Sequence, residues 1–365
     1  MSPGSGARTG VANLPLHYGK APRWLFDRMV KLAREITIII VSDFGAEEML
    51  RRLSDPYWFQ AFGCVLGFDW HSSGVTTTLC GALKEGTKGI ERDLNFYVAG
   101  GKGKTSRKTP EELENWGQLI SVDSTPLIYA SRMSAKVDSA AVQDGYQLYH
   151  HNFFFTGNGS WAVVQQGMNE ANHFARRYHW LSESLVSFVN EPHSAIQSEA
   201  RGKALNLVAA ESDPVRVLMP QIVNNEKPEK VLADLKRIKT LTMPAHHYLG
   251  TEDLHPDSLA KILVSTYERQ PEDFETLLGL EGVGAKTLRA LSLISELVYG
   301  VAPSYRDPAR YSFAHGGKDG IPYPVDKKTY DRSIEILAKA VNRAKLGIQD
   351  KKEAMSRLSR MSSHG

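Results

Sequence analysis

The sequence predicts an α+β domain at its amino-terminal side, followed by an all-α domain. Two segments that resemble strands, 146–155 and 160–166, are joined by Thr156-Gly-Asn-Gly159 and predict a β-hairpin. Beyond Pro214 the apolar spacing is helical, with turn signals between the helices. Because 365 residues exceed one ordinary module, two domains are expected. We expect a flexible tail at 1–12, the α+β domain at 13–215, the all-α domain at 216–348 and a polar basic tail at 349–365.

Local spacing predicts the elements of the first domain. Helices are expected over 21–35, 45–53, 76–85 and 168–190. The apolar run Ile36–Val41 predicts a buried strand, and Asn95–Val98 predicts a short one. Thr109, followed by a proline and two acids, predicts a capped helix start. In the second domain, helices are expected over 231–241, 256–267, 271–278, 285–299 and 327–346.

Composition excludes several classes of protein. Hydrophobic residues make up 42% and charged residues 23%, as in globular proteins, and no apolar run is long enough to span a membrane. The two cysteines, Cys64 and Cys80, provide neither a disulfide framework nor a metal-binding spacing. We therefore expect a cytoplasmic, nucleoid-associated protein with no membrane partner; the sequence leaves its oligomeric state open.

The most specific motif lies at residues 273–299, DFETLLGLEGVGAKTLRALSLISELVY. Two apolar helices are separated by Glu281-Gly-Val-Gly284, and the glycines allow a phosphate to approach the backbone N–H groups at the second helix start. Val283 is expected to fill the gap between the helices. This pattern predicts an all-α helix-hairpin-helix domain that binds a DNA backbone phosphate through Gly282, Val283, Gly284 and Thr287, without reading sequence.

Gly282-Val-Gly-Ala-Lys-Thr287, together with Pro322-Tyr-Pro-Val-Asp326, resembles the helix-hairpin-helix DNA glycosylases of the endonuclease III and archaeal 8-oxoguanine glycosylase type. The resemblance covers roughly residues 225–348. It implies that Lys286 is the Schiff-base nucleophile and that Asp326 assists it, on a base flipped out of duplex DNA. It implies no cofactor. The residues by themselves favour simpler roles, Lys286 as a phosphate contact and Asp326 as a helix N-cap, and capping is compatible with catalysis.

The whole chain resembles the domain-of-unknown-function family 763, found mainly in archaea and thermophilic bacteria. The resemblance is carried by the segments 16–19, 69–78, 148–151, 161–169 and 313–320. Within the last of these, His315 stands in a glycine-rich loop and is a further candidate for catalysis.

A second group of candidates lies in the first domain and comprises Asp69, His71, Asp144, His150, His151, Gln165 and Gln166. An acid, a hairpin and polar strand ends match the layout of metal-dependent nucleases, which would require a divalent metal. Two other interpretations remain open: polar bonding in an aromatic interior, and a cleft for flipped bases or single strands. Residues 69–78 are expected to cap a helix or to bind an anion there.

The loop that follows the short strand is purely basic. Val98-Ala-Gly-Gly-Lys-Gly-Lys-Thr105 ends like a phosphate loop but lacks the first glycine of that motif. Lys102, Lys104, Arg107 and Lys108 are therefore predicted to contact nucleic-acid phosphates. Taken together, the sequence predicts a DNA-binding repair protein acting as a glycosylase/lyase. The alternatives are a metal-dependent, structure-selective nuclease and a non-enzymatic nucleic-acid-binding accessory protein.

Overall fold

The computed structural model describes residues 21–68, 74–198, 202–241, 255–309 and 327–363. It is a mixed fold of helices and antiparallel sheets with a helical carboxy-terminal region, as the sequence predicted. Among the helices described, none is long and apolar enough to cross a membrane. The first helices are α1 (Arg23–Phe44), α2 (Ala46–Ser54), α3 (Pro56–Leu66), α4 (Gly74–Thr87), α5 (Glu91–Leu94), α6 (Thr109–Ile120) and α7 (Thr125–Lys136).

The main sheet has five antiparallel strands in the order β1-β3-β4-β5-β6. Their bounds are β1 (Tyr97–Lys102), β3 (Gln147–Phe155), β4 (Trp161–Asn169), β5 (Phe174–Leu181) and β6 (Ala195–Gln197). A smaller sheet pairs β2 (Val142–Gln143), β7 (Lys203–Asn206) and β8 (Ser304–Arg306). The predicted hairpin of β3 and β4 is confirmed, with Phe155 opposite Trp161.

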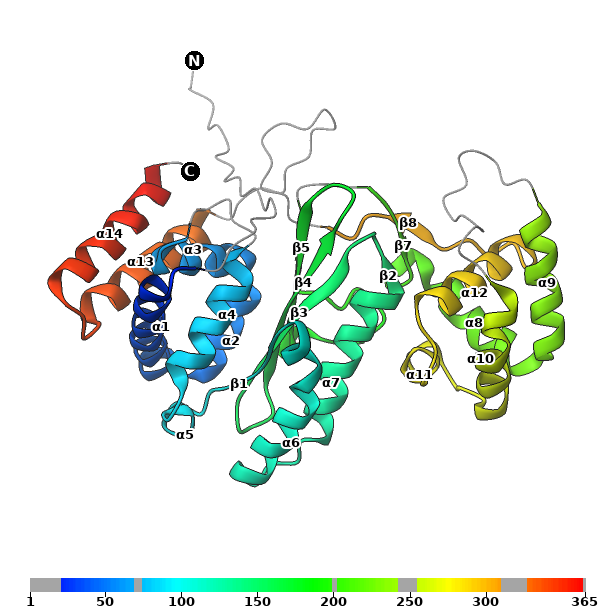
Figure 1. The fold of residues 1–365 in the computed structure, drawn as a ribbon, viewed down its shortest axis with the longest axis horizontal. Helices are drawn as coiled ribbons and strands as arrows, with labels where there is room; N and C mark the ends of the chain where they lie inside the picture. The colour runs from blue at the N-terminus through cyan, green and yellow to red at the C-terminus, as the bar shows by residue number, and fades with distance from the viewer. Residues whose placement is uncertain (1–20, 69–73, 199–201, 242–254, 310–326, 364–365) are drawn as a thin grey trace, which may run out of the picture.

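Helices cover both faces of the main sheet (Figure 1). One face packs on α1 to α4 through a core that includes Val98, Phe154 and Val164. The other face packs on α6, α7 and the turn η2 (Val137–Ala141), through Phe153, Phe155 and Trp180. Alternate strand residues therefore enter two different cores, and this separation decides where the polar side chains of the sheet can meet.

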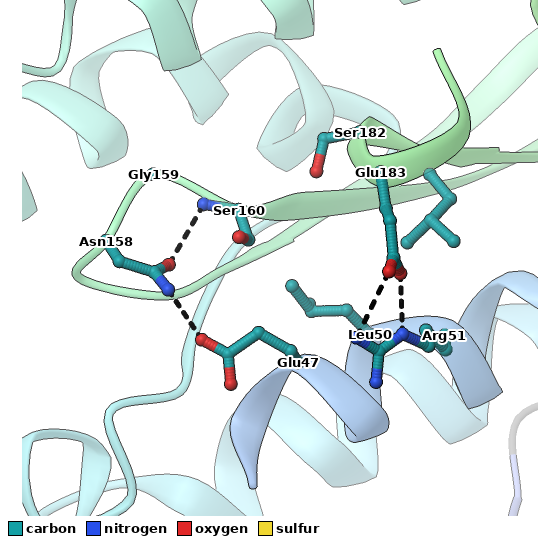
Figure 2. A pocket seen from close by; sticks show the side chains of 9 residues that line it. Glu47, Leu50, Arg51, Asn158, Gly159, Ser160, Ser182 and Glu183 are labelled. Atoms are coloured by element: carbon teal, nitrogen blue, oxygen red, sulfur yellow. Dashed lines mark hydrogen bonds and ion pairs between the residues drawn. The ribbon is translucent and has the colours of Figure 1, made fainter.

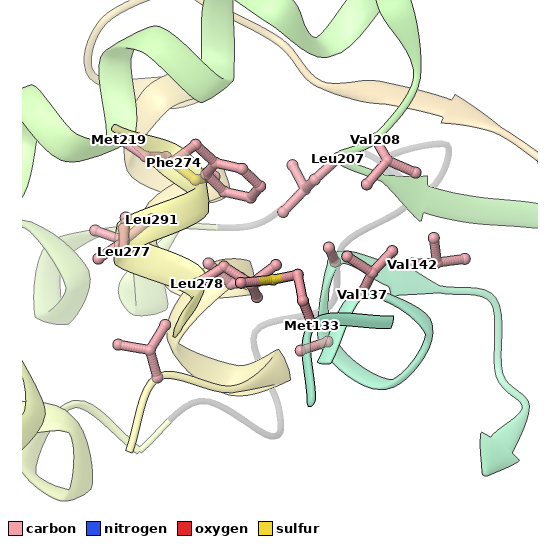
Figure 3. Packing of buried hydrophobic residues seen from close by; sticks show 14 of the residues in the cluster. Met133, Val137, Val142, Leu207, Val208, Met219, Phe274, Leu277, Leu278 and Leu291 are labelled. Carbon is pink, nitrogen blue, oxygen red and sulfur yellow. The ribbon is translucent and has the colours of Figure 1, made fainter. Parts of the chain in front are cut away.

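The remaining helices lie at opposite ends of the molecule (Figure 1). They are α8 (Asp213–Asn225), α9 (Pro228–Thr240), α10 (Pro256–Arg269), α11 (Phe274–Gly279), α12 (Ala285–Leu297), α13 (Lys327–Arg343) and α14 (Ile348–Ser363). Figure 3 shows that α8, α11 and α12 share one apolar core with α7 and η2, where Met133 and Val137 meet Leu277 and Leu278. The packing is therefore continuous across residue 215.

The last two helices turn back to the amino-terminal helices. Leu337 and Val341 of α13, and Ala354 and Leu358 of α14, are buried in the core that contains α1 and α3. The predicted polar tail at 349–365 is thus largely the helix α14. Ala354 and Leu358 are four positions apart and form a narrow apolar stripe along α14. Because most residues of this segment are polar, its overall composition does not reveal the stripe.

Three local predictions are wrong. Ile36–Val41 belongs to helix α1, because Ile36 and Ile40 continue the buried face begun by Met29 and Leu32. The segment predicted as a helix over 168–190 contains strand β5 instead. Thr109 is the first residue of α6, and its hydroxyl donates to Ser106 O rather than capping the helix.

Candidate functional site

The turn between α11 and α12 exposes backbone N–H groups to solvent. Gly282 has φ +84°, a left-handed conformation that favours glycine, and a side chain added to Gly284 would meet nothing within 4 Å. Among the described contacts, the N–H groups of Gly284, Ala285 and Lys286 have no acceptor. Val283 is 1% exposed and packs between the helices, as the spacing predicted.

Lys136, the last residue of α7, holds this turn from beneath. Its ammonium donates to three carbonyl oxygens, those of Leu278 at 2.9 Å, Leu280 at 2.9 Å and Val283 at 2.5 Å. These three carbonyl groups therefore point inward at a positive charge, whereas the N–H groups of Gly284, Ala285 and Lys286 are without an acceptor among the described residues. Gln143 adds a second link, because its amide donates to Ala285 O and accepts from Arg289.

The structure brings only some of the predicted DNA-binding residues together. Lys286 is exposed beside the turn and forms no ion pair with the described residues, whereas Thr287 is 2% exposed and points inward. The predicted basic residues Lys102, Lys104, Arg107 and Lys108 are exposed on β1 and the following turn η1 (Gly103–Lys108), away from α12. Asp69, His71, His315 and Asp326 lie outside the described residues.

The histidines and glutamines of the hairpin are divided between the two faces of the sheet. His151 and Gln165 face α7: Nδ1 of His151 donates to Gln165 Oε1 at 2.8 Å, and its Nε2 accepts from the Ser131 hydroxyl at 2.9 Å. Gln165 in turn donates to Asp138 at 2.6 Å, which also binds His193. These hydrogen bonds connect the side chains of Ser131, His151, Gln165 and Asp138, and all four side chains are buried. Burial lowers the pKa of His151.

Asp144 lies on the same face as His151 but in a separate cluster. Its carboxylate accepts from Arg176 at 2.8 Å and from the Tyr178 hydroxyl at 2.7 Å. Arg176 also binds Asp307 at 2.8 Å, so that the two acids flank one buried guanidinium. Within the described residues, no group of three or more His, Cys, Asp or Glu side chains is arranged to hold a metal ion.

His150 and Gln166 lie on the opposite face, in a row of polar residues that crosses all five strands. Adjacent strands pair Lys102 with His150, His150 with Gln166, Gln166 with Arg177, and Arg177 with Gln197. We call these five residues the polar row. His150 shares this face with Phe154 because alternate strand residues point the same way, and the bulge of β3 lies just before it, between Leu148 and His150.

Arg177 is the most buried charge of the polar row, with 0% of its surface exposed. Its acceptors are all neutral: His179 Nε2 at 2.9 Å, Gln60 Oε1 at 3.0 Å, Thr76 Oγ1 and Pro56 O at 3.4 Å, and the Gln197 amide oxygen. In the described part of the chain it has no ion pair. Burial without a counter-charge lowers the pKa of Arg177 to about 9.

His150 is the second unusual member of the polar row. It is 2% exposed, and neither ring nitrogen has a hydrogen-bond partner among the described residues. Burial, His151 and Lys102 together lower the pKa of His150 to about 3, so the ring is neutral at physiological pH. A buried polar group without a partner is uncommon and calls for an explanation, such as a ligand.

A surface hollow of about 350 Å³ lies at the far end of the β3–β4 hairpin (Figure 2). Its polar side chains satisfy one another: Asn158 donates to Glu47 at 2.6 Å, and Arg51 donates to Glu183 at 2.5 Å. Because these groups are already paired and exposed, the hollow offers less to a ligand than the polar row.

The sequence alone identified the α11–α12 turn, His150 and Gln166 as candidates. It did not identify Lys136 or Gln197, nor the place of Arg177 in the polar row. A signal for Arg177 existed in the aromatic-rich segment 174–181, which is typical of a strand, but the expected helix over 168–190 concealed it. Nothing in the sequence near Lys136 indicates that it binds a turn 142 residues away.

Comparison with known proteins identifies the family of the chain. The family model described as protein of unknown function DUF763 matches residues 10–325, and the chain therefore belongs to that family. Neither the curated proteins nor the solved structures contain a match to the chain.

Proposed function

We propose that this member of the DUF763 family binds the phosphate backbone of duplex DNA, using the α11–α12 turn as a helix-hairpin-helix. One observation carries the proposal. Three carbonyl groups at the turn, those of Leu278, Leu280 and Val283, converge on Lys136, whereas the N–H groups of Gly284, Ala285 and Lys286 have no acceptor among the described residues. Unpaired N–H donors at the positive end of a helix favour an anion.

The surroundings of the turn favour a backbone contact over reading of bases. The exposed Lys286 adds a mobile positive charge beside the N–H groups. Glycines leave the backbone accessible without offering side chains that distinguish one base pair from another. We therefore expect binding that depends strongly on salt and weakly on sequence.

Gly284→Glu tests the proposal without disturbing the fold. The residue has φ −144° and open space around it, so the variant is expected to fold normally. The added carboxylate would repel the phosphate, and duplex affinity measured by fluorescence anisotropy at 100 mM salt should fall about tenfold or more. Gly202→Glu makes the same charge change at another open glycine and should have little effect. Equal affinities of the two variants would refute the assignment.

Base excision by Lys286 and Asp326 remains a prediction from the resemblance to glycosylases. If it is right, borohydride should trap an adduct with duplexes containing 8-oxoguanine or an abasic site, and Lys286→Gln should abolish the adduct. Duplex affinity should fall only severalfold, since the backbone N–H groups remain. Cleavage that EDTA abolishes and Lys286→Gln leaves unchanged would instead support a metal-dependent nuclease. Binding without cleavage would indicate an accessory protein.

A further inference from the structure

The polar row lies on the face of the sheet toward α3 and α4, whereas the α11–α12 turn packs with helices on the other face. It is therefore separate from the surface assigned above to duplex DNA. Neighbouring strands lie about 4.8 Å apart, so the five side chains extend over roughly 19 Å in a straight line. The arrangement spans residues from 102 to 197, and local sequence does not account for it.

The charges of the polar row are positive and uncompensated. Arg177 is fully buried among neutral acceptors, and Lys102 at the β1 end is exposed above the Tyr149 ring, 5.7 Å from its centroid. Neither forms an ion pair with the described residues. The first turn of α4 adds to this potential, because Thr76 contacts Arg177 and the amino-terminal end of a helix carries a partial positive charge.

Several donors along the row have hydrogen bonds still to make. The neutral His150 ring has one donor and one acceptor nitrogen, both without a partner, the Gln197 amide nitrogen has none, and the Lys102 ammonium forms no hydrogen bond within the described part of the chain. His150 and Gln197 are both buried, so their unmet capacity is a cost that a bound acceptor would remove.

We propose that the polar row binds a phosphoryl group, with His150 and Lys102 as its direct ligands and Arg177 as the buried charge behind them. A phosphoryl group offers several acceptor oxygens and negative charge, which matches free donors in a positive environment. A metal cation would be repelled by Lys102 and Arg177. The basic turn η1, which continues directly from Lys102, extends the same potential to the surface.

The test uses the full-length protein with inorganic phosphate as the probe, followed by NMR of labelled histidine. Phosphate should shift the His150 resonances in a saturable way, whereas an equal ionic strength of chloride should not. Lys102→Ala and His150→Leu should each weaken phosphate binding about tenfold or more. Lys239→Ala removes an exposed lysine of α9 and should leave the affinity unchanged.

Two further probes distinguish the sources of the group. Tighter binding of a 5′-phosphorylated octathymidylate than of its 5′-hydroxyl form and of dTMP would assign the site to a polynucleotide end. Tighter binding of dTMP would assign it to a free nucleotide. The proposal is overturned if phosphate fails to shift His150, or if Lys102→Ala and His150→Leu bind phosphate as the wild type does. Gly284→Glu, which is expected to weaken duplex binding at the α11–α12 turn, should retain phosphate binding at the polar row. The two proposals can therefore be refuted independently of each other.

Discussion

Lys136→Met is expected to destabilise the protein and to weaken duplex binding together. The substitution removes an ammonium that donates to three carbonyl oxygens, two of them on the buried residues Leu278 and Val283. A hydrogen bond to a charged group contributes about 1.5–3 kcal/mol, and carbonyl groups left without donors add a penalty. Because the three bonds share one ammonium and solvent can replace part of them, we expect a loss of about 3 kcal/mol in the free energy of unfolding.

The effect on binding follows from the same geometry. Without Lys136 the carbonyl groups of Leu278, Leu280 and Val283 are free to rotate outward and to place acceptors beside the unpaired N–H groups. Duplex affinity should fall about tenfold, measured by anisotropy at a temperature where circular dichroism shows the variant to be folded.

A conservative variant of Lys136 and a variant of a different lysine serve as controls. Lys136→Arg retains the charge and several donors and should restore part of both losses. Lys239→Met, on the exposed surface of α9, should change neither. An unaltered unfolding midpoint in Lys136→Met would show that the three carbonyl bonds contribute little, and would remove the basis for an inward orientation of the turn.

Much of the fold was accessible from the sequence because helical spacing and turn residues act locally. The helices from α9 to α13, the β3–β4 hairpin and the position of the glycine turn all follow from such patterns. The strand expected at Ile36–Val41 is wrong because a short apolar run fits a buried strand and a buried helical segment alike. Four residues separate Ile36 from Ile40, and both continue the buried face of α1.

The candidate sites were less accessible, because they depend on which strands become neighbours. His150 and His151 are adjacent in the sequence, so they point to opposite sides of the sheet, and which core each one meets depends on how the helices pack on the two faces. Arg177 and Gln197 join His150 through pairings that span dozens of residues. A sequence pattern can identify polar residues in strands, but cross-strand register places them in one row.

His150→Leu is expected to stabilise the protein, and most strongly in acid. The folded state holds the pKa of His150 at about 3, against about 6.5 for an unfolded chain. Between these values the unfolded chain binds a proton that the folded protein excludes, so stability falls as the pH drops below about 6.5. The pH value of 5 lies about 1.5 pH units below the pKa of histidine in the unfolded chain. Since each pH unit corresponds to about 1.36 kcal/mol, the cost at pH 5 is about 2 kcal/mol. Leucine removes the cost, and at pH 7.5 it also removes two unpartnered ring nitrogens, a gain of about 1 kcal/mol.

Urea unfolding at pH 5 and pH 7.5 measures both effects, with His151→Leu as the matched comparison. His151 is bonded through both nitrogens to Ser131 and Gln165, so its leucine variant should lose about 2 kcal/mol at pH 7.5. Some acid sensitivity should persist in His150→Leu, because burial also lowers the pKa values of His151 and His179. If His150→Leu is destabilising at both pH values, the ring has a structural role that its surroundings do not reveal. A variant that is more stable yet no longer binds phosphate would mean that the wild-type chain keeps an unfavourable buried imidazole because a ligand requires it.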